Sequence, residues 1–253
     1  KGARREAAAV PLLLVRHASN DWLGHRLAGW TPGVHLNERG RAEAALLAAR
    51  LAGHPIDAVY ASPVERTMET ARYVAGPHDL EVLVDEAVGE IRCGEWEGRE
   101  LSVLRTDPLW ARMRADPIEV SYPGGENIQQ VQSRAVAFLE RLRSEHAGVV
   151  AVVSHADVVK SVVAHYLGLP LERFRRLQVA PASLTVLHSS GSGFRLVLFN
   201  DIGAVPVETA ASGASQADQG QRQSVPGPRR PARLGSTGAP SAAPASRPSA
   251  SPR

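Results

Sequence analysis

The sequence predicts an α/β fold, a three-layer α/β/α sandwich whose central sheet is mostly parallel. Residues 10–15 and 149–153 are short branched-aliphatic runs of the kind that form buried parallel strands. Segments with helical spacing of apolar residues alternate with such runs along the chain, as expected for a sheet covered on both faces. Two further runs, at 183–190 and 194–201, flank a glycine-containing turn and predict a closing hairpin.

The first two helices are predicted from apolar periodicity and from signals at their ends. Segment 37–53 ends in a glycine and carries four apolar residues on one helical face. These are Ala44, Leu47, Ala48 and Leu51. The second helix follows the second strand directly. We expect Ser62 to cap it, Pro63 to lie in its first turn and Glu65 to complete a capping box.

The later elements are predicted in the same way. Residues 80–86 form a third strand or a sheet edge, and residues 158–168 form a short helix after the strongest buried strand. The helix over 126–146 has a continuous apolar face. That face consists of Ile128, Val131, Ala135, Phe138, Leu139 and Leu142.

A change of composition divides the chain into three predicted parts: an N-terminal extension (1–9), a folded domain (10–202) and a tail (203–253). Ala, Ser, Pro, Gly and Gln dominate the tail, which cannot bury enough apolar surface to offset its ordering entropy, so we predict disorder. The tail also holds six arginines and two carboxylates, a surplus of four positive charges, whereas the whole chain has a net charge of +3. The rest of the chain therefore has a net charge of −1. The domain therefore offers no basic face for nucleic acid.

The cysteine content and the hydropathy restrict the location and the partners. Cys93 is the single cysteine, so no disulfide can form within the chain, and a reducing, cytoplasmic location is expected. No second thiol lies near it, which favours a small buried residue over a nucleophile. No apolar stretch approaches the length of a membrane span, so we expect neither a membrane nor a nucleic acid as partner.

Charged residues interrupt the apolar pattern at four places. Arg16 and His17 end the first strand, and Arg66 lies in the first turn of the helix after the second strand. His155 ends the strand at 149–153, and Glu90 lies in a loop after the third strand. Because parallel strands share one C-terminal edge, these side chains can converge there.

Two arginines and two histidines around one point describe a pocket for a phosphoryl dianion. Guanidinium groups are forked donors suited to phosphate, and a helix N-terminus adds backbone N–H groups. A neutral imidazole can attack phosphorus and form a phosphohistidine, while Glu90 is the nearby group able to transfer a proton. Taken singly, Arg66 reads as a solvated helix residue and His155 as a core histidine. The prediction therefore rests on their joint placement.

A metal hydrolase is a less favoured interpretation. His155 and Asp157 lie two residues apart, and His17 is a further nitrogen donor. However, two arginines in the same pocket would repel a cation, and a carboxylate-rich shell is missing. We therefore expect no metal and no cofactor.

The same residues lie in motifs that resemble the histidine phosphatase superfamily, which includes the cofactor-dependent phosphoglycerate mutases. The resemblance covers about residues 12–201. The motifs are Arg16-His17-Ala18 (family R-H-G), Leu36–Gly40 (L-T-E-R-G), Ser62–Arg66 (S-P-x-x-R), Glu90–Gly98 (E-x-x-x-G-x-x-E-G) and Ser154-His155-Ala156 (S-H-G). The resemblance implies the phosphoglycerate mutase-like fold, with His17 as the nucleophile and Glu90 as the proton donor. It also implies that Arg16, Arg66 and His155 hold the phosphoryl group.

Further positions match those near the substrate in the family: Asn20, Ala28, Gly29 and Ala156. The sequence departs from the family at Ala18 and Ala156, which replace the glycine after each histidine. If either position needs a positive φ, alanine costs on the order of 1 kcal/mol.

Three functions fit this pattern: a phosphatase, a phosphoglycerate mutase-type phosphomutase, and a weakly active or inactive phospho-ligand-binding protein. A mutase must hold an acceptor carboxylate away from water, which calls for a longer lid with clustered basic residues. Segment 99–122 is short, and the following Tyr122–Asn127 resembles the P-G-G-E-S of the phosphatase branch. The sequence therefore favours a phosphatase that acts on a small phosphorylated metabolite through a phosphohistidine.

Overall fold

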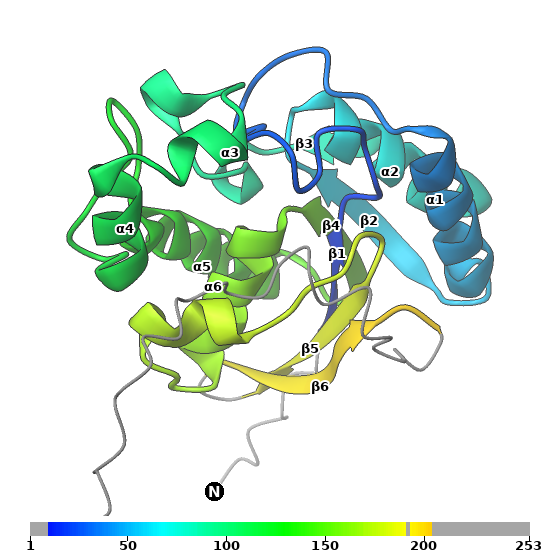
Figure 1. Ribbon diagram of the computed structural model, residues 1–253. Helices are drawn as coiled ribbons and strands as arrows, with labels where there is room; N and C mark the ends of the chain where they lie inside the picture. Colours follow the sequence, from blue (N-terminus) through cyan, green and yellow to red (C-terminus); the bar gives the residue numbers. More distant parts are fainter. Residues whose placement is uncertain (1–9, 191–192, 204–253) are drawn as a thin grey trace, which may run out of the picture. The chain divides into compact units, whose positions relative to one another are not determined.

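The computed structural model describes residues 10–190 and 193–203 (Figure 1). The predicted extension (1–9) and, apart from Gly203, the predicted tail lie outside the described residues. The strands are β1 (Pro11–Arg16), β2 (Ile56–Ala61), β3 (Val82–Val84), β4 (Val149–Ser154), β5 (Leu184–Ser190) and β6 (Gly193–Asp201). The α-helices are α1 (Glu38–Leu51), α2 (Glu65–Ala75), α3 (Leu101–Leu104), α4 (Pro108–Ala115), α5 (Ile128–Glu145) and α6 (Ala156–Tyr166). The short 3-10 helices are η1 (Gly76–His78), η2 (Glu86–Val88), η3 (Gly94–Trp96) and η4 (Leu171–Arg176).

The strands form one sheet of six, in the order β3-β2-β4-β1-β5-β6. β3, β2, β4 and β1 are parallel, whereas β5 and β6 pair antiparallel as a hairpin at the edge. This confirms the predicted mostly parallel sheet and its closing hairpin. The central pair β1 and β4 places Arg16 opposite Ser154, so the residues that follow both strands leave the sheet at the same edge.

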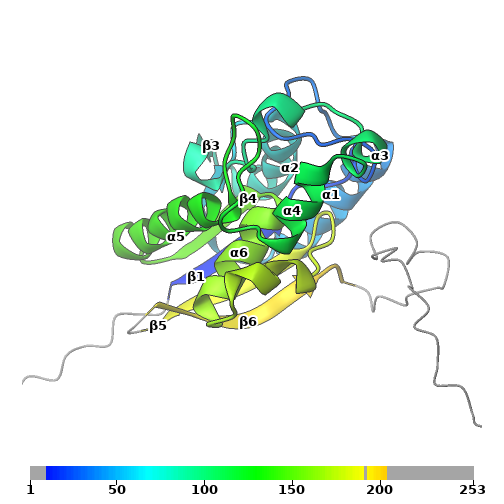
Figure 2. The ribbon, with the colours of Figure 1, turned by 60° about the vertical axis from the view of Figure 1, so that its left-hand side comes forward.

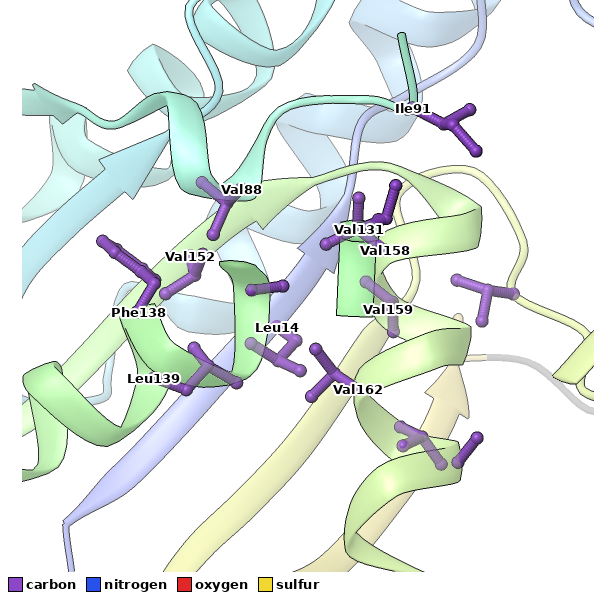
Figure 3. Packing of buried hydrophobic residues seen from close by; sticks show 14 of the residues in the cluster. Leu14, Val88, Ile91, Val131, Phe138, Leu139, Val152, Val158, Val159 and Val162 are labelled. Atoms are coloured by element: carbon purple, nitrogen blue, oxygen red, sulfur yellow. The ribbon is translucent and has the colours of Figure 1, made fainter. Parts of the chain in front are cut away.

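Helices cover both faces of the sheet, as predicted. In Figures 1 and 2, α1 and α2 lie on one side and α5 and α6 on the other. Successive side chains of β1 point to opposite faces of the sheet, so this strand contributes to two hydrophobic cores. Leu13 and Val15 pack toward α1 and α2, whereas Leu12 and Leu14 pack toward α5 and α6. Figure 3 shows the second of these cores, where Leu14 lies between Leu139 of α5 and Val162 of α6.

The predicted helical faces are confirmed in α1 and α5, where every apolar residue named from the sequence is buried. The predicted capping box of α2 is wrong. The helix begins at Glu65, with Val64 as N-cap and no side-chain cap. Ser62 Oγ instead lies 2.9 Å from Nε2 of His155. The hydroxyl that the local sequence pattern assigned to the end of α2 is thus bonded to His155, which lies between β4 and α6.

Candidate active site

A pocket of about 130 Å³ opens beyond the C-terminal ends of β1 and β4. Residues from the β1–α1 loop, the first turn of α2, the loop after η2 and the start of α6 line it. They are Arg16, His17, Asn20, Trp22, Leu23, Gly24, Arg26, Leu27, Ala28, Gly29, Arg66, Glu90, Ile91, Cys93, Tyr122 and Asp157. The structure thus brings together most of the residues named from the sequence, although they come from segments far apart in the chain.

His17 is fixed in one tautomer. Its backbone N–H donates to the carbonyl of Ser154 (2.9 Å), which holds the residue at the end of β1. Its Nδ1 lies 2.8 Å from the carbonyl oxygen of Ala18. A carbonyl can only accept, so Nδ1 carries the proton and Nε2 keeps its lone pair. Burial, followed by the charges of Arg66 and Arg16, lowers the pKa of His17 well below 6.5. The imidazole is therefore neutral, as a nucleophile must be.

The two buried arginines are each anchored at one end and unsatisfied at the other. Arg16 Nη1 donates to the carbonyl of Val179 (2.6 Å), and Arg66 Nη2 donates to the carbonyl of Gly29 (2.8 Å). Within residues 10–190 and 193–203, the buried Arg16 Nε and Arg66 Nη1 have no hydrogen-bond partner. Such groups are costly to leave unpaired, so these two guanidinium groups are ready to bind oxygens of an anion.

His155 is fully buried behind His17 and does not itself line the pocket. The two ring centroids are 5.3 Å apart in an edge-on arrangement. Nδ1 of His155 lies 3.4 Å from Arg66 Nη2, which can only donate, so Nε2 carries the proton and donates to Ser62 Oγ. Burial and the nearby charge of Arg66 lower the pKa of His155 well below 6.5. A dianion bound beside it would counter that effect and favour the imidazolium.

Glu90 faces the same histidines from a loop that α5 holds in place. Its Oε2 lies 3.5 Å from Nδ1 of His155, and its side chain is 19% exposed. Arg134 of α5 donates to the backbone carbonyls of Ala87, Gly89 and Glu90 at 2.8–2.9 Å. Trp30 Nε1 donates to the carbonyl of Glu90 as well (2.6 Å). These bonds fix the loop that presents the carboxyl group.

The surroundings of Glu90 favour its protonated form. Burial raises the pKa of Glu90, and the negative charge of Asp157 raises it further. Asp157 itself stays ionised: burial opposes this, but Lys160, whose Nζ donates to it (3.2 Å), and Arg175 lower its pKa. The pocket thus raises the pKa of one carboxyl group, Glu90, and lowers that of the other, Asp157. Glu90 is therefore the group that can release a proton.

The residues predicted to lie near the substrate have different outcomes. Asn20, Ala28 and Gly29 line the pocket, but Ala156 does not: it starts α6 and packs against the apolar core. Neither Ala156 nor Ala18 has a positive φ, so alanine in place of the family's glycine causes no backbone strain.

Several pocket residues escaped the sequence analysis as site residues. Arg26, Trp22 and Tyr122 line the pocket from loops, where a single side chain gives no periodic signal. Arg134 does not line the pocket but supports it from α5, where it pairs with Glu126 at 3.0 Å, and nothing in the sequence pattern marked it. Cys93, predicted to be a small buried residue, is indeed fully buried.

The described residues contain neither a cluster of metal ligands nor a membrane-spanning helix. Nowhere in them do three or more His, Cys, Asp or Glu side chains gather in a way that could hold a metal ion. Among the helices of the same residues, none has both the length and the apolar character needed to cross a membrane.

Comparison with known proteins places the chain in a family. The sequence model of the histidine phosphatase superfamily (branch 1) matches residues 12–202. Phosphoserine phosphatase 1 of Hydrogenobacter thermophilus is 35% identical over 184 residues, 71% of this chain and 86% of that protein. A probable phosphoglycerate mutase, GpmB, of Photorhabdus laumondii is 29% identical over 179 residues, 70% of this chain and 83% of that protein.

A solved structure agrees with the sequence comparisons. The mycobacterial glucosyl-3-phosphoglycerate phosphatase in complex with VO3 has a TM-score of 0.68 and 28% identity, covering 76% of this chain and 99% of that one. The match covers the sheet, both helical layers and the motifs around the pocket, so this chain belongs to the histidine phosphatase superfamily.

Proposed function

We propose that the protein hydrolyses small phosphomonoesters through a phosphohistidine on His17. The observation that carries the proposal is a pair of buried guanidinium N–H groups, on Arg16 and Arg66, that have no partner among the described residues and lie beside a neutral imidazole. A phosphoryl group offers the oxygens that these donors lack. Phosphoryl transfer depends mainly on positioning and on charge stabilisation, and this pocket provides both.

In the first step, Nε2 of His17 attacks phosphorus and the ester oxygen leaves. Arg16 and Arg66 stabilise the charge on the phosphoryl oxygens, with His155 beside them. The N-terminus of α6, which begins directly after His155, adds its dipole. Glu90 donates its proton to the leaving alkoxide, so the alcohol departs neutral and the phosphoryl group stays on His17.

In the second step, the ionised Glu90 takes a proton from water as that water attacks the phosphohistidine. The P–N bond breaks, inorganic phosphate leaves and His17 regains its lone pair. Glu90 ends the cycle protonated, as it began. Each residue thus returns to its starting state without a cofactor in either step.

The lid favours hydrolysis over a mutase reaction. A mutase would need basic side chains of the lid directed into the pocket to hold the carboxylate of the acceptor. The lid is segment 99–122, and three of its arginines are candidates for this role: Arg105 after α3, and Arg112 and Arg114 in α4. All three are exposed, and none lines the pocket. Trp110 of α4 packs on Trp96, with ring centroids 6.1 Å apart. Water, rather than a retained bisphosphate, is therefore the proposed acceptor.

A panel of phosphorylated metabolites, screened for released phosphate, tests the proposal. We expect several esters to be cleaved at modest rates, and the activity to persist in a metal chelator. Strong activity confined to the interconversion of phosphoglycerates would identify a mutase instead. Binding of the esters without release of phosphate would identify a binding protein. We further propose a small phosphorylated metabolite as the partner and, given the single buried Cys93, the cytoplasm as the location.

A further inference from the structure

The proposed mechanism leaves one arginine of the pocket without a role. Arg26 lies in the loop between β1 and α1 and lines the pocket. Arg16 and Arg66 are buried at the inner end, whereas the side chain of Arg26 is 45% exposed, which places it at the mouth. A phosphoryl group held at the inner end therefore directs the rest of its ester toward Arg26.

The backbone of Arg26 is fixed, but its side chain is lightly held. Arg26 and Glu100 form an isolated antiparallel bridge, and the N–H of the following Leu27 donates to the carbonyl of Arg99 (2.9 Å). Among the described residues, the guanidinium makes one ion pair, from Nη2 to Glu100 Oε1 at 3.3 Å, and one long hydrogen bond, from Nη1 to the carbonyl of Gly98 at 3.5 Å. It also lies 5.5 Å from the centroid of the Trp22 ring. Both partners of the ion pair are exposed, and exposed pairs contribute little to stability. A ligand can therefore replace Glu100 with little loss.

The chemistry of the mouth indicates what that ligand group is. The pocket residues next to Arg26 in sequence (Trp22, Leu23, Gly24 and Leu27) are uncharged. A guanidinium presents a planar fork that matches a carboxylate. One arm of this fork, Nη2, already donates to a carboxylate oxygen of Glu100 at 3.3 Å, and the other arm, Nη1, reaches the carbonyl of Gly98 at 3.5 Å.

We propose that Arg26 is a specificity-determining residue that binds a carboxylate on the leaving group, displacing the carboxylate of Glu100. The inference rests on the proposed phosphatase function and narrows it to phosphomonoesters of hydroxy acids. Glu100 then competes with the substrate for Arg26 and weakens the binding of these esters.

Two pairs of esters isolate the carboxylate. O-phosphoserine and O-phosphoethanolamine differ only by that group, and 3-phosphoglycerate differs from glycerol 3-phosphate by a carboxylate in place of a hydroxymethyl group. The kcat/KM of each ester is measured for the wild type, Arg26→Gln and Glu100→Gln. Arg39→Gln is the matched control, because Arg39 also forms an exposed ion pair but belongs to α1 and does not line the pocket.

In Arg26→Gln we expect the ratio of kcat/KM within each pair, carboxylate ester over its partner, to fall by about 10- to 100-fold. The change should lie mainly in KM, because the carboxylate is bound in the ground state as well as in the transition state. In Glu100→Gln the same ratio should rise several-fold, and Arg39→Gln should leave it unchanged.

A structural role for the ion pair gives a different result. If Arg26 only joins two loops, Arg26→Gln and Glu100→Gln lower both esters of each pair alike, and the proposal is overturned. Unchanged ratios in both variants overturn it too. If the wild type releases phosphate from none of the four esters, the proposed function fails. Calorimetric binding of the same esters to the same variants then decides the role of Arg26 independently.

Discussion

The inner end and the mouth of the pocket use the same residue type in opposite ways. At the inner end, Arg16 and Arg66 are buried, and each keeps one N–H that has no partner in the described part of the chain. At the mouth, Arg26 is exposed and paired with Glu100. A buried guanidinium has lost water and gains strongly from a bound anion, whereas an exposed one exchanges one partner for another. The inner end is thus suited to catalysis and the mouth to discrimination among esters.

The largest effect should come from the inner end, at His17. We expect His17→Ala to lower kcat by about 10⁴-fold or more and to abolish the phosphoenzyme, because no other nucleophile is placed for attack. Rapid acid-free quenching with a radiolabelled ester measures the phosphoenzyme. His54→Ala, a change at an exposed histidine, is the control. A labelled phosphoenzyme in His17→Ala would point to another nucleophile, with His155 the first to examine.

Glu90 should show an effect that depends on the leaving group. Glu90→Gln cannot donate the proton that an alkoxide needs, so we expect alkyl esters to slow by about 10²- to 10⁴-fold. An aryl ester with an acidic leaving group should still phosphorylate His17, and the adduct should accumulate because its hydrolysis lacks a base. The measurement is a burst of phenol followed by slow turnover. Equal slowing of aryl and alkyl esters, without a trapped adduct, would show that Glu90 is not the proton donor.

A substitution at Arg66 tests the role that we assign to the buried arginines. Lysine at this position keeps the charge but loses the fork that bonds Gly29 and the phosphoryl oxygens together. We expect Arg66→Lys to lower kcat/KM by about 10²- to 10³-fold on every ester. The exposed Arg72 of the same helix is the control, and circular dichroism checks that both variants fold. A loss confined to carboxylate esters would mean that the inner end also discriminates.

A smaller effect is expected on the pH dependence, through Asp157. The pKa of Glu90 is raised by burial and by Asp157, and kcat/KM requires the protonated acid, so activity falls as pH rises through that pKa. Asp157→Asn removes one negative charge, lowers the pKa of Glu90 and moves this basic limb to lower pH. The acid limb, set by the depressed pKa of His17, should stay below pH 6.5.

The pH profiles of kcat/KM for an alkyl and an aryl ester check this expectation. The shift should appear with the alkyl ester and be weak with an aryl ester whose leaving group needs no proton. Asp79→Asn is the control, since Asp79 is exposed and its positive φ suits asparagine. If the basic limb for the alkyl ester does not move in Asp157→Asn, then Asp157 does not raise the pKa of the group that donates the proton.

The sequence predicted what local pattern and chain topology determine. Apolar runs predicted the strands, and the rule that parallel strands share one edge predicted that Arg16, His17 and His155 lie close together. The family model then confirmed the resemblance on which the assignment of roles depends. Those roles themselves stay predictions.

Contacts between residues distant in the chain were beyond prediction. Ser62 was expected to cap α2, but its hydroxyl bonds His155, 93 residues away. Arg134 reads as a solvated helix residue, yet it bonds the carbonyl of Glu90, 44 residues away. In both cases a tertiary partner outweighs a local preference, and a single sequence carries no record of that partner.

The smallest effect is expected from removing the C-terminal tail, because no motif residue lies beyond Asp201 in the sequence. We predict that a chain truncated after Val205 folds and keeps its kcat/KM. Strand β6 ends at Asp201, whose carboxylate pairs with Arg50 of α1 and so ties the last strand to the helical layer. This contact and every pocket residue precede the truncation. Residues beyond Val205 lack apolar periodicity, so they have no face with which to complete a core. Thermal unfolding and ester hydrolysis of the truncated and the full chain check the two parts of this prediction. A lower unfolding midpoint in the truncated chain would place the domain boundary further along the sequence. Lost activity at an unchanged midpoint would give the tail a part in catalysis.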